Sequence, residues 1–516
     1  MPNELFFGKN RVCAVVAART AREASRQLRE ALRHTSTVEL RLDWLANSAE
    51  IRKLFAFLRK RSLASEINLI ATCRRAIAGG KFTGDAVAQL SLLRSAITAG
   101  CRWADVEIET VESVPGFALD LYTARARRIL SWHDFSGLPD SKGLARITRH
   151  MTQLCADRRF DAIKVAAKCE SLHDSLRLLA LARHRRNVIA VPMGDAATPM
   201  RILAVNEGSA LSYAPVEQAT APGQIALAEL RELYRGGNFT RKTRVFGVIG
   251  DPIAHSLSPA IFNGGFHARK IDAVFLPFRV TDMDDFIAAI HPLGIAGFSV
   301  TLPHKQEILD YLHHCEPVAY AIGAVNTGAV RANGKLFGYN TDSIGVLRAL
   351  TGRLTIRGSR VLILGAGGAA RAAAFTLARE GSSVSVCSRR IEKARQLARA
   401  VDGAVVPRHE LETLSFDAVI NATPVGMHPH EGESPLAASE MNCALAFDMI
   451  YRPRRTKFLQ LAAERGIKTV SGLQMFLAQA MAQWEIWFGG HAPAAAMRRA
   501  VLVALRRDER RNEKTT

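Results

Sequence analysis

"RVLILGAGGAARAAAFTLARE", residues 360–380, decides the fold of the second half of the chain. An apolar run, a glycine-rich turn and an alanine-rich helical stretch follow one another here, and this order opens a dinucleotide-binding βαβ unit. Gly365, Gly367 and Gly368 would let the backbone approach a pyrophosphate at the start of the helix. The stretch therefore predicts a Rossmann domain, and an ordinary strand–helix turn is the competing interpretation.

The strand that follows, "SSVSVCSRR", indicates which dinucleotide binds. A site for NAD normally carries an acidic residue about twenty positions after the glycines, where it bonds the ribose hydroxyls. Here the strand ends in Ser388, Arg389 and Arg390, and Lys393 follows. These side chains favour a 2′-phosphate and include no carboxylate to repel it, so we expect NADP(H) as the cofactor.

Several polar fragments lie upstream of the Rossmann motif, between residues 244 and 345, where they would be unusual in a plain core. The fragments "HSLSP", "SVTLPHK", "GAVNT" and "GYNTD" supply hydroxyl, ammonium, amide and carboxylate groups, a set suited to a polyhydroxylated acid. Taken singly, each has an ordinary explanation; Asp342, for example, could cap the helix that follows it. The residues concerned are Ser256, Ser258, Thr301, Lys305, Asn326 and Asp342.

Short apolar runs alternate with helix-period segments through the first half of the chain, which predicts a parallel (β/α)8 barrel. The fold class is therefore α/β throughout. The predicted strands are residues 13–18, 38–44, 67–73, 105–109, 128–134, 162–167, 188–193 and 210–214.

Lys164 interrupts the apolar strand "AIKVAA" at residues 162–167, and lysine is seldom buried without a purpose. The carboxyl ends of barrel strands face the active site, where an unprotonated amine beside Arg41 or Arg74 could form a Schiff base with a ketone. His133 suits removal of the adjacent proton. The alternatives are a strand-end lysine that reaches solvent and a histidine of the core. The polar residues at these strand ends are Glu39, Arg41, Arg74, Glu107, His133 and Lys164.

Composition limits the function classes. The chain has 516 residues, which suggests two or three domains, and its eight scattered cysteines include no CxxC pair. We expect reduced thiols in a cytoplasm and no metal site. No apolar run reaches the ~18 residues of a membrane span, and the N-terminus lacks a signal-peptide pattern. The net charge of +21 would suit acidic substrates; no nucleic-acid motif accompanies it, although the charge alone keeps that class as an alternative.

The fragments "VELRLDW", "SWHDF", "IKVA" and "ATAPGQI" make residues 11–235 resemble type I 3-dehydroquinate dehydratase. The resemblance implies that Lys164 forms an imine with the ketone of 3-dehydroquinate, that His133 is the acid and base, and that water is lost without a metal to give 3-dehydroshikimate. It also implies substrate contacts from Glu39, Arg41, Arg74, Arg201, Thr220 and Gln224, with Arg201 on the carboxylate and Thr220 in place of the usual serine.

One position departs from that family. An acidic residue usually precedes the double glycine after the third strand and pairs with the histidine, but "CRRAIAGG" has Ala78 there. His133 thereby loses an orienting partner. An alternative follows, in which only the second half is an active enzyme and the barrel is impaired or merely binds ligand.

"HSLSP", "VTLPHK", "GAVNT", "GYNTD", "GAGGAAR", "NATPVGM" and "GLQMFLAQA" make residues 244–505 resemble shikimate dehydrogenase. The resemblance implies that Lys305 and Asp342 form the catalytic pair while NADPH delivers a hydride. It implies that shikimate is held by Ser256, Ser258, Thr301, Asn326, Asp342 and Gln479, with Tyr451 close by. The implied cofactor residues are Gly365, Ala366, Gly367, Gly368, Ala369, Ser388 (where the family often has Asn), Arg389, Lys393, Asn421, Thr423 and Met427.

The product of the first reaction is the substrate of the second, and the order resembles fused bifunctional enzymes of the shikimate pathway known from plants and some bacteria. We expect small-molecule partners, no membrane contact and a cytoplasmic location, or a plastid if a transit peptide was removed. Oligomeric state and the choice between shikimate and quinate stay open. The expected divisions are a barrel (1–236), a linker (237–243), a substrate lobe (244–350), a Rossmann domain (351–471) and returning helices (472–516).

Overall fold

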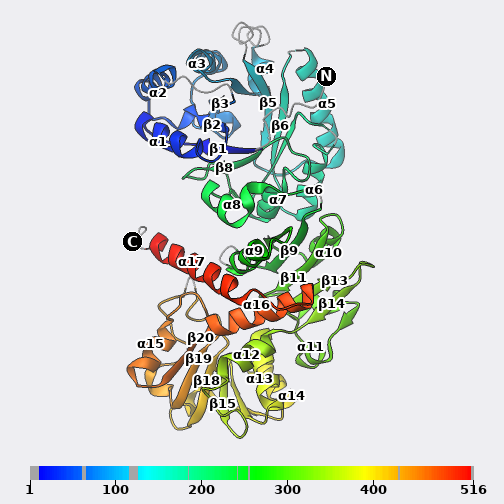
Figure 1. Cartoon of the computed structure of the whole chain (residues 1–516), viewed down its shortest axis with the longest axis vertical. Helices are drawn as coiled ribbons and strands as arrows, with labels where there is room; N and C mark the ends of the chain where they lie inside the picture. The colour runs from blue at the N-terminus through cyan, green and yellow to red at the C-terminus, as the bar shows by residue number, and fades with distance from the viewer. Residues whose placement is uncertain are drawn as a thin grey trace. The chain divides into compact units, whose positions relative to one another are not determined.

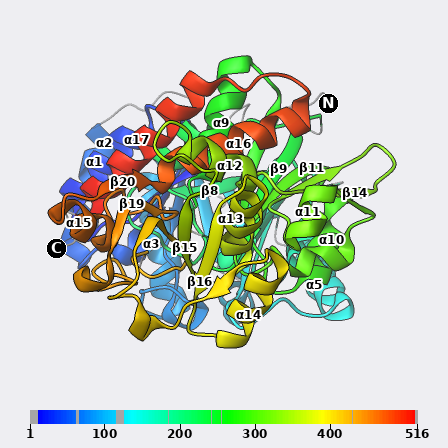
Figure 2. The ribbon, with the colours of Figure 1, turned by 90° about the horizontal axis from the view of Figure 1, so that it is seen from below.

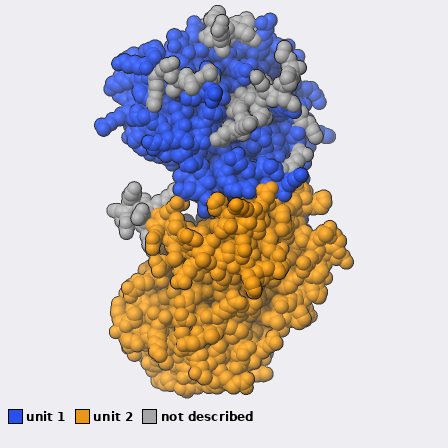
Figure 3. Space-filling view, in the orientation of Figure 1, with its two compact units in different colours: residues 1–243, 284–289 blue, residues 244–283, 290–516 orange. Residues whose placement is uncertain are grey.

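A computed structural model describes residues 11–60, 66–114, 126–157, 159–183, 185–240, 242–253, 256–427 and 430–512 of the chain. The chain divides into two compact units, coloured separately in Figure 3. The first holds residues 1–243 with 284–289, and the second holds 244–283 with 290–516.

Eight parallel strands form the sheet of the first unit, in the order β7-β6-β5-β4-β3-β2-β1-β8. Between the outer two, the backbone N–H of Ala210 donates to the carbonyl of Val188 at 2.9 Å, so the barrel is nearly closed. The predicted (β/α)8 architecture is confirmed. The strands are β1 (Val12–Val16), β2 (Thr37–Arg41), β3 (Asn68–Thr72), β4 (Trp103–Glu107), β5 (Arg127–Asp134), β6 (Ala162–Lys168), β7 (Val188–Met193) and β8 (Ser212–Pro215).

Helices follow the barrel strands in the chain and cover the outside of the sheet (Figure 1). The first begins where the Thr20 side chain accepts a hydrogen bond from the N–H of Glu23, as an N-cap does. The helices are α1 (Ala21–Ala31), α2 (Ser48–Lys60), α3 (Ala86–Thr98), α4 (Ile108–Ser113), α5 (Ser141–Asp157), α6 (Leu172–Ala180), α7 (Thr198–Leu203) and α8 (Leu227–Leu233).

Alternation along each barrel strand stacks an apolar layer beneath a polar one. Trp103 and Ile129 belong to a buried apolar cluster, together with Ala162. Two residues further along the same strands stand Asp105, Ser131 and Lys164, all buried. Because side chains two apart share a face, the polar residues lie one step nearer the carboxyl ends of the strands. The fold thereby places ionisable groups where barrel enzymes keep their active sites.

The second unit contains two six-stranded sheets. The first is mixed, in the order β10-β9-β11-β13-β14-β12, and β13 runs antiparallel to β11 and β14. Its strands are β9 (Arg244–Gly250), β10 (Ala273–Arg279), β11 (Ile295–Val300), β12 (His314–Cys315), β13 (Thr327–Val330) and β14 (Leu336–Tyr339). The helices α9 (Ser258–Arg269) and α11 (Pro317–Ile322) belong to the same unit, whereas α10 (Met283–Ile290) follows β10 in the chain but is mostly counted with the first unit.

The other sheet is parallel, in the order β17-β16-β15-β18-β19-β20, which is the arrangement of a Rossmann domain and confirms that prediction. Its strands are β15 (Arg360–Leu364), β16 (Ser383–Cys387), β17 (Ala404–Val405), β18 (Phe416–Asn421), β19 (Cys443–Asp448) and β20 (Lys468–Ser471). Its helices are α13 (Gly368–Arg379), α14 (Ile391–Ala400) and α15 (Lys457–Glu464).

Three further helices complete this unit, α12 (Asp342–Leu350), α16 (Gly472–Phe488) and α17 (Ala494–Asn512). Helices α12 and α16 pack side by side (Figures 1 and 2). A Cβ at Gly345 would lie 2.9 Å from Cγ of Met475, so glycine allows this close approach. Within α16, Gln483 donates to the carbonyl of Asn326 at 3.0 Å, which ties the helix to the mixed sheet.

Candidate active sites

Lys164 stands inside the barrel between two carboxylates. Its Nζ lies 3.3 Å from Oε1 of Glu39 and 3.0 Å from Oδ2 of Asp105, and the ring of Tyr213 lies 4.3 Å away. The lysine is 5% exposed. Thr72 also donates to Glu39. The amine is therefore enclosed but well supplied with charged partners.

Asp105 connects these residues, and the sequence interpretation overlooked it. Its Oδ1 accepts from Nη2 of Arg74 at 3.0 Å and from the hydroxyl of Ser131 at 2.6 Å. Burial alone would raise the pKa of Asp105, but Arg74 and Lys164 hold it well below its usual value. A signal was present, because Asp105 precedes Glu107 by two residues and so shares its face.

The neighbours of Lys164 differ from the cations that the sequence suggested. Arg41 is bound by Asp43 through two hydrogen bonds of 2.9 and 2.8 Å. Arg74 reaches the cluster through Asp105, and its Nη1 lies 3.5 Å from Glu107. The groups bonded to Lys164 are thus carboxylates, so the amine must pass on a proton before it can attack a ketone.

His133 follows two residues after Ser131 on β5. Its Nδ1 is buried and has no hydrogen-bond partner in the part of the chain that the structure describes. Burial, followed by the charges of Arg74 and Lys164, lowers the pKa of His133 well below its usual value. Phe135 stacks with the imidazole at 6.2 Å between ring centroids and also lies against Gly79, next to Ala78.

Arg201, Thr220 and Gln224 form a second group in the barrel. Nη1 of Arg201 donates to the carbonyls of Pro192 and Pro222 at 3.2 and 3.3 Å, and burial lowers its pKa to about 10. Oε1 of Gln224 accepts from the backbone N–H of Thr220 at 2.7 Å and from its hydroxyl at 3.2 Å. A buried guanidinium bound to carbonyl oxygens alone suits an anionic ligand. No hydrogen bond among the described residues joins this group to Lys164.

In the second unit, Lys305 and Asp342 form an ion pair with Nζ 2.5 Å from Oδ2. Asn326 donates to the other oxygen of Asp342 at 2.9 Å and approaches Oε1 of Gln479 at 3.4 Å. Asp342 begins α12, Asn326 precedes β13 and Gln479 belongs to α16. The structure thus brings together four predicted site residues from distant parts of the chain.

The remaining residues predicted to bind substrate lie at the ends of nearby elements. Ser258 begins α9, and its N–H donates to the hydroxyl of Ser256 at 3.3 Å. Ser256 also interacts with Tyr451, whose pKa burial raises. Thr301 directly follows β11, and its backbone N–H donates to the carbonyl of Ile249 at 2.9 Å. Hydroxyl groups therefore gather at the carboxyl edge of the mixed sheet.

The glycine-rich turn fits a pyrophosphate. Gly365 has a φ of 109°, which favours glycine, and a Cβ on Gly367 would meet nothing within 4 Å. Ala366 lies within the turn, and Ala369 is the second residue of α13. A Cβ on Gly368 would stand 3.0 Å from Cβ of Lys305. The turn therefore combines an open face toward a ligand with contact to the predicted catalytic lysine.

The basic residues after β16 remain accessible to a phosphate. Arg389 and Lys393 are exposed, and neither takes part in an ion pair within the described part of the chain. The hydroxyl of Ser388 accepts from the N–H of Arg390 at 3.3 Å. On the other side of the turn, Asn421 accepts from the N–H and hydroxyl of Thr423, and Met427 is 41% exposed. These groups fit the chemistry of an NADP molecule.

Comparison with known proteins identifies the families of both halves of the chain. The family model of type I 3-dehydroquinase matches residues 12–237. The models of the shikimate dehydrogenase substrate-binding domain, of shikimate/quinate 5-dehydrogenase and of the shikimate 5′-dehydrogenase C-terminal domain match residues 248–327, 349–435 and 472–502.

A chloroplastic bifunctional 3-dehydroquinate dehydratase/shikimate dehydrogenase from Arabidopsis thaliana is 31% identical over 482 residues, which are 88% of this chain and 78% of the relative. The chain belongs to this bifunctional family. An NADP(+) shikimate dehydrogenase from Methanosarcina acetivorans is 41% identical over 277 residues, 51% of this chain and 99% of the relative. The crystal structure of shikimate 5-dehydrogenase from Thermus thermophilus with NADP(H) and shikimate is 34% identical, with a TM-score of 0.47, and covers 51% of this chain and 100% of that one.

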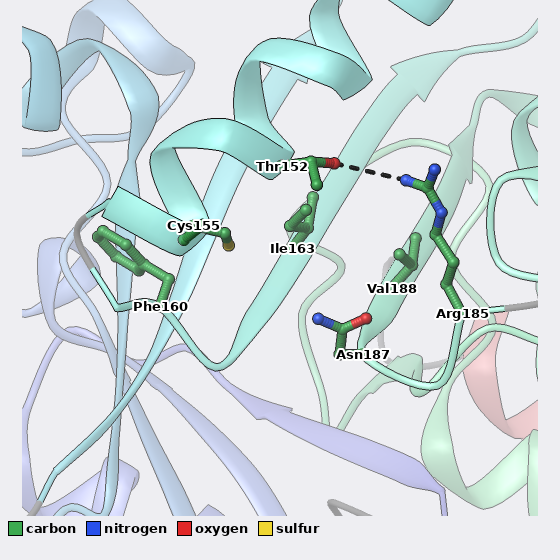
Figure 4. A pocket seen from close by; sticks show the side chains of 8 residues that line it. Thr152, Cys155, Phe160, Ile163, Arg185, Asn187 and Val188 are labelled. Atoms are coloured by element: carbon green, nitrogen blue, oxygen red, sulfur yellow. Dashed lines mark hydrogen bonds between the residues drawn. The ribbon is translucent and has the colours of Figure 1, made fainter.

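A pocket of about 300 Å³ lies at the amino ends of β6 and β7 (Figure 4). None of the residues that line it is one of the predicted site residues. Cys155, Phe160 and Ile163 line it, and Arg185 donates to Thr152 at 3.4 Å across it. Burial raises the pKa of Cys155 to about 12, so the thiol is unreactive. Among the described residues, no cluster of His, Cys, Asp or Glu could hold a metal ion, and no helix is long and apolar enough to cross a membrane.

Proposed function

We propose that this chain performs two consecutive reactions: dehydration of 3-dehydroquinate to 3-dehydroshikimate in the barrel, and reduction of that product to shikimate with NADPH in the second unit. The observation that carries the proposal is the presence of a candidate catalytic lysine in each unit: Lys164 is buried in the barrel, and Lys305 in the second unit lies against the glycine-rich turn. Lys164 would attack the ketone of 3-dehydroquinate, and Lys305 would protonate the ketone oxygen of 3-dehydroshikimate during its reduction. Membership of the bifunctional family supports both halves.

In the dehydratase, Lys164 first passes a proton to a neighbouring carboxylate and attacks the substrate ketone, so that water leaves and an iminium forms. The iminium acidifies the adjacent C–H bond. The neutral imidazole of His133 removes that proton and returns it to the departing hydroxyl, which leaves as water. Hydrolysis of the imine then releases 3-dehydroshikimate. Glu39, Arg41 and Arg74 orient the ring, while Arg201 with Thr220 and Gln224 holds the carboxylate.

In the dehydrogenase, the bound NADPH supplies a hydride. The residues of the chain hold the ketone beside it and stabilise the charge that develops on the ketone oxygen. Lys305 donates a proton to that oxygen, and Asp342 fixes the ammonium through the 2.5 Å ion pair. Asn326 and Gln479 steady the carboxylate, and Ser256, Ser258, Thr301 and Tyr451 bind the hydroxyl and carboxylate groups of the substrate.

The cofactor is assigned to residues on both sides of the glycine-rich turn. Arg389 and Lys393 would hold the 2′-phosphate, and Ser388 would bond the ribose. The turn itself would cradle the pyrophosphate, while the segment from Asn421 to Met427, with Thr423, would border the nicotinamide. Exposed cations without ion pairs support this assignment.

A coupled assay tests the proposal. The purified chain, given 3-dehydroquinate and NADPH, should oxidise NADPH and form shikimate, and each half should also work when given its own substrate. Absence of NADPH oxidation from added 3-dehydroshikimate would overturn the second reaction. Oxidation from 3-dehydroshikimate alone, with none from 3-dehydroquinate, would establish the alternative in which only the dehydrogenase is active; the unpartnered Nδ1 of His133 favours that alternative.

The proposed divisions of the chain are those expected from the sequence, namely residues 1–236, 237–243, 244–350, 351–471 and 472–516. We also propose a reducing compartment, the cytoplasm or a plastid stroma. All eight cysteines are free thiols, which supports this location. The partners proposed are the small-molecule substrates.

A further inference from the structure

Asp448, the last residue of β19, is a fully buried carboxylate to which neither reaction assigns a role. Its Oδ1 accepts from Nδ2 of Asn421 and from the backbone N–H of Ile450, both at 3.0 Å. Its Oδ2 accepts from the hydroxyl of Thr456 at 2.6 Å. Burial raises its pKa to about 6 despite these three donors, so the group is kept at a cost in stability.

Through Asn421, Asp448 is connected to the turn of residues 421–427, which is proposed to border the nicotinamide. Asn421 ends β18, and its Oδ1 accepts from the N–H of Thr423 at 3.0 Å and from its hydroxyl at 2.7 Å. Its Nδ2 reaches the carbonyl of Val425 at 3.2 Å as well as Asp448. Asn421 therefore shapes the turn of residues 421–427, and Asp448 fixes the orientation of its amide.

Through Ile450, Asp448 is also connected to the segment that carries Tyr451, a proposed substrate contact. The N–H of Ile450 is held by Asp448, and the next residue is Tyr451, which stacks on Phe476 at 4.3 Å between centroids and interacts with Ser256. Thr456, bound to the other carboxylate oxygen, caps α15. The side chain of Asp448 thus bonds both the first and the last residue of the segment 450–456.

We propose that Asp448 is a positioning residue of the dehydrogenase, which fixes the turn 421–427 and the segment carrying Tyr451 relative to each other. The inference rests on the proposed function and extends it. One carboxylate has enough acceptor capacity for donors from both segments, whereas a neutral apolar side chain has none. Loss of this anchor should loosen the cofactor side and the substrate side together, because both segments share it.

The test compares three variants of the full chain. Asp448→Ala removes all three hydrogen bonds. Asp448→Asn keeps an acceptor for Asn421 and Ile450 and can donate to the hydroxyl of Thr456. Ser359→Ala is the matched control. Ser359 is also buried and hydrogen-bonded, to Ile356 at 2.7 Å and to Ser382 at 3.0 Å. It precedes β15, at the amino end of its strand, whereas Asp448 lies at the carboxyl end of β19 in the same sheet.

For Asp448→Ala we expect the KM values for NADPH and 3-dehydroshikimate each to rise about tenfold or more, the effect of losing buried hydrogen bonds to a charged group. Asp448→Asn should stay within about threefold of the parent, and Ser359→Ala should leave both KM values unchanged even if it lowers the melting temperature. Parental KM values in Asp448→Ala would overturn the proposal and leave Asp448 a purely structural residue.

Further measurements apply if Asp448→Ala does not fold or if the parent does not reduce 3-dehydroshikimate. If Asp448→Ala does not fold, Thr456→Val replaces it, because this variant lacks the hydroxyl that bonds Oδ2 of Asp448. Thr456→Val should raise both KM values about threefold, whereas Thr456→Ser, which keeps a hydroxyl, should show parental KM values. Parental KM values in Thr456→Val would reject the inference. If the parent does not reduce 3-dehydroshikimate, the proposed function fails separately. NADP+ titration of the parent and of Asp448→Ala by intrinsic fluorescence would then decide, with equal affinities counting against the inference.

Discussion

Nζ of Lys164 lies 3.0 Å from Oδ2 of Asp105, and the other oxygen of that carboxylate accepts from Arg74 at 3.0 Å. A single buried carboxylate thus joins the proposed nucleophile to a cation across the barrel. Removal of one partner from a buried ion pair is strongly destabilising, because the remaining charge is buried without compensation. The reactivity of Lys164 should therefore depend on Asp105, although Asp105 itself forms no bond to carbon.

Asp105→Asn should lower dehydratase kcat/KM by about tenfold or more, because the amide no longer neutralises the buried charges of Lys164 and Arg74. The measurement is the appearance of 3-dehydroshikimate by its ultraviolet absorbance. Shikimate dehydrogenase activity of the same preparation serves as an internal control and should not change. Undiminished dehydration by Asp105→Asn would show that Glu39 alone suffices as the partner of Lys164.

Lys164→Ala should abolish dehydration while reduction of 3-dehydroshikimate continues at the parental rate. Borohydride added with 3-dehydroquinate should inactivate the parent, because it reduces the imine to a stable amine, and mass spectrometry should place the adduct on Lys164. Lys168→Ala is a matched control, since that lysine of the same strand is paired with Glu170 at the surface. An adduct on any other residue, or rapid dehydration without Lys164, would refute the Schiff-base mechanism.

The sequence predicted those features of the fold that depend on local periodicity. Its eight barrel strands and its Rossmann turn are where the apolar runs suggested, because buried parallel strands carry continuous apolar stretches. The short strands β12, β13 and β14 were missed, since runs of two to four residues carry little periodic signal.

The same distinction holds for the site residues. Motif residues such as Lys305 and Asp342 were predicted and do lie together. Asp105 and Asp448 were not, because their significance depends on partners 59 and 27 residues away in the chain, at hydrogen-bond distance only after folding. The carboxylates bonded to Lys164 were not predicted for the same reason, and neither was the ion pair of Arg41 with Asp43, which strand positions alone do not indicate.

The dehydratase should retain activity well below pH 6.5, the ordinary pKa of a histidine. His133 must be neutral to act as a base, and burial together with Arg74 and Lys164 lowers its pKa, so the neutral form persists as the pH falls. Ala78→Glu should move the acid limb of the kcat/KM profile to higher pH, because a nearby carboxylate favours the imidazolium. Ala78→Gln, similar in size but uncharged, should leave the limb in place. If the glutamate and glutamine variants share one profile, position 78 does not influence His133.

Arg389→Ala should weaken the binding of NADPH much more than the binding of NADH. A charge-assisted hydrogen bond to a phosphate contributes roughly 1.5–3 kcal/mol, so the KM for NADPH should rise about tenfold or more while that for NADH changes little. Arg395→Ala is a suitable control, because this exposed arginine of α14 is already paired with Glu392. Equal losses for both cofactors in Arg389→Ala would rule out the 2′-phosphate contact.

Asp448 should make the second unit less stable as the pH rises. Its folded-state pKa of about 6 exceeds the ordinary value of 3.8, so folding favours the protonated form. The resulting stabilisation is complete below about pH 4 and is lost as the pH rises through about 6, a change of about 3 kcal/mol.

Asp448→Asn, which stays neutral, should lack this dependence. Its melting temperature relative to that of the parent should therefore increase between about pH 4 and about pH 8, when the transition of the second unit is followed by calorimetry. The carboxylate is buried, so salt should screen the effect little. Parallel melting curves for the two proteins across this range would mean that Asp448 titrates in the folded chain as it does in the unfolded one, and that its burial carries no electrostatic cost.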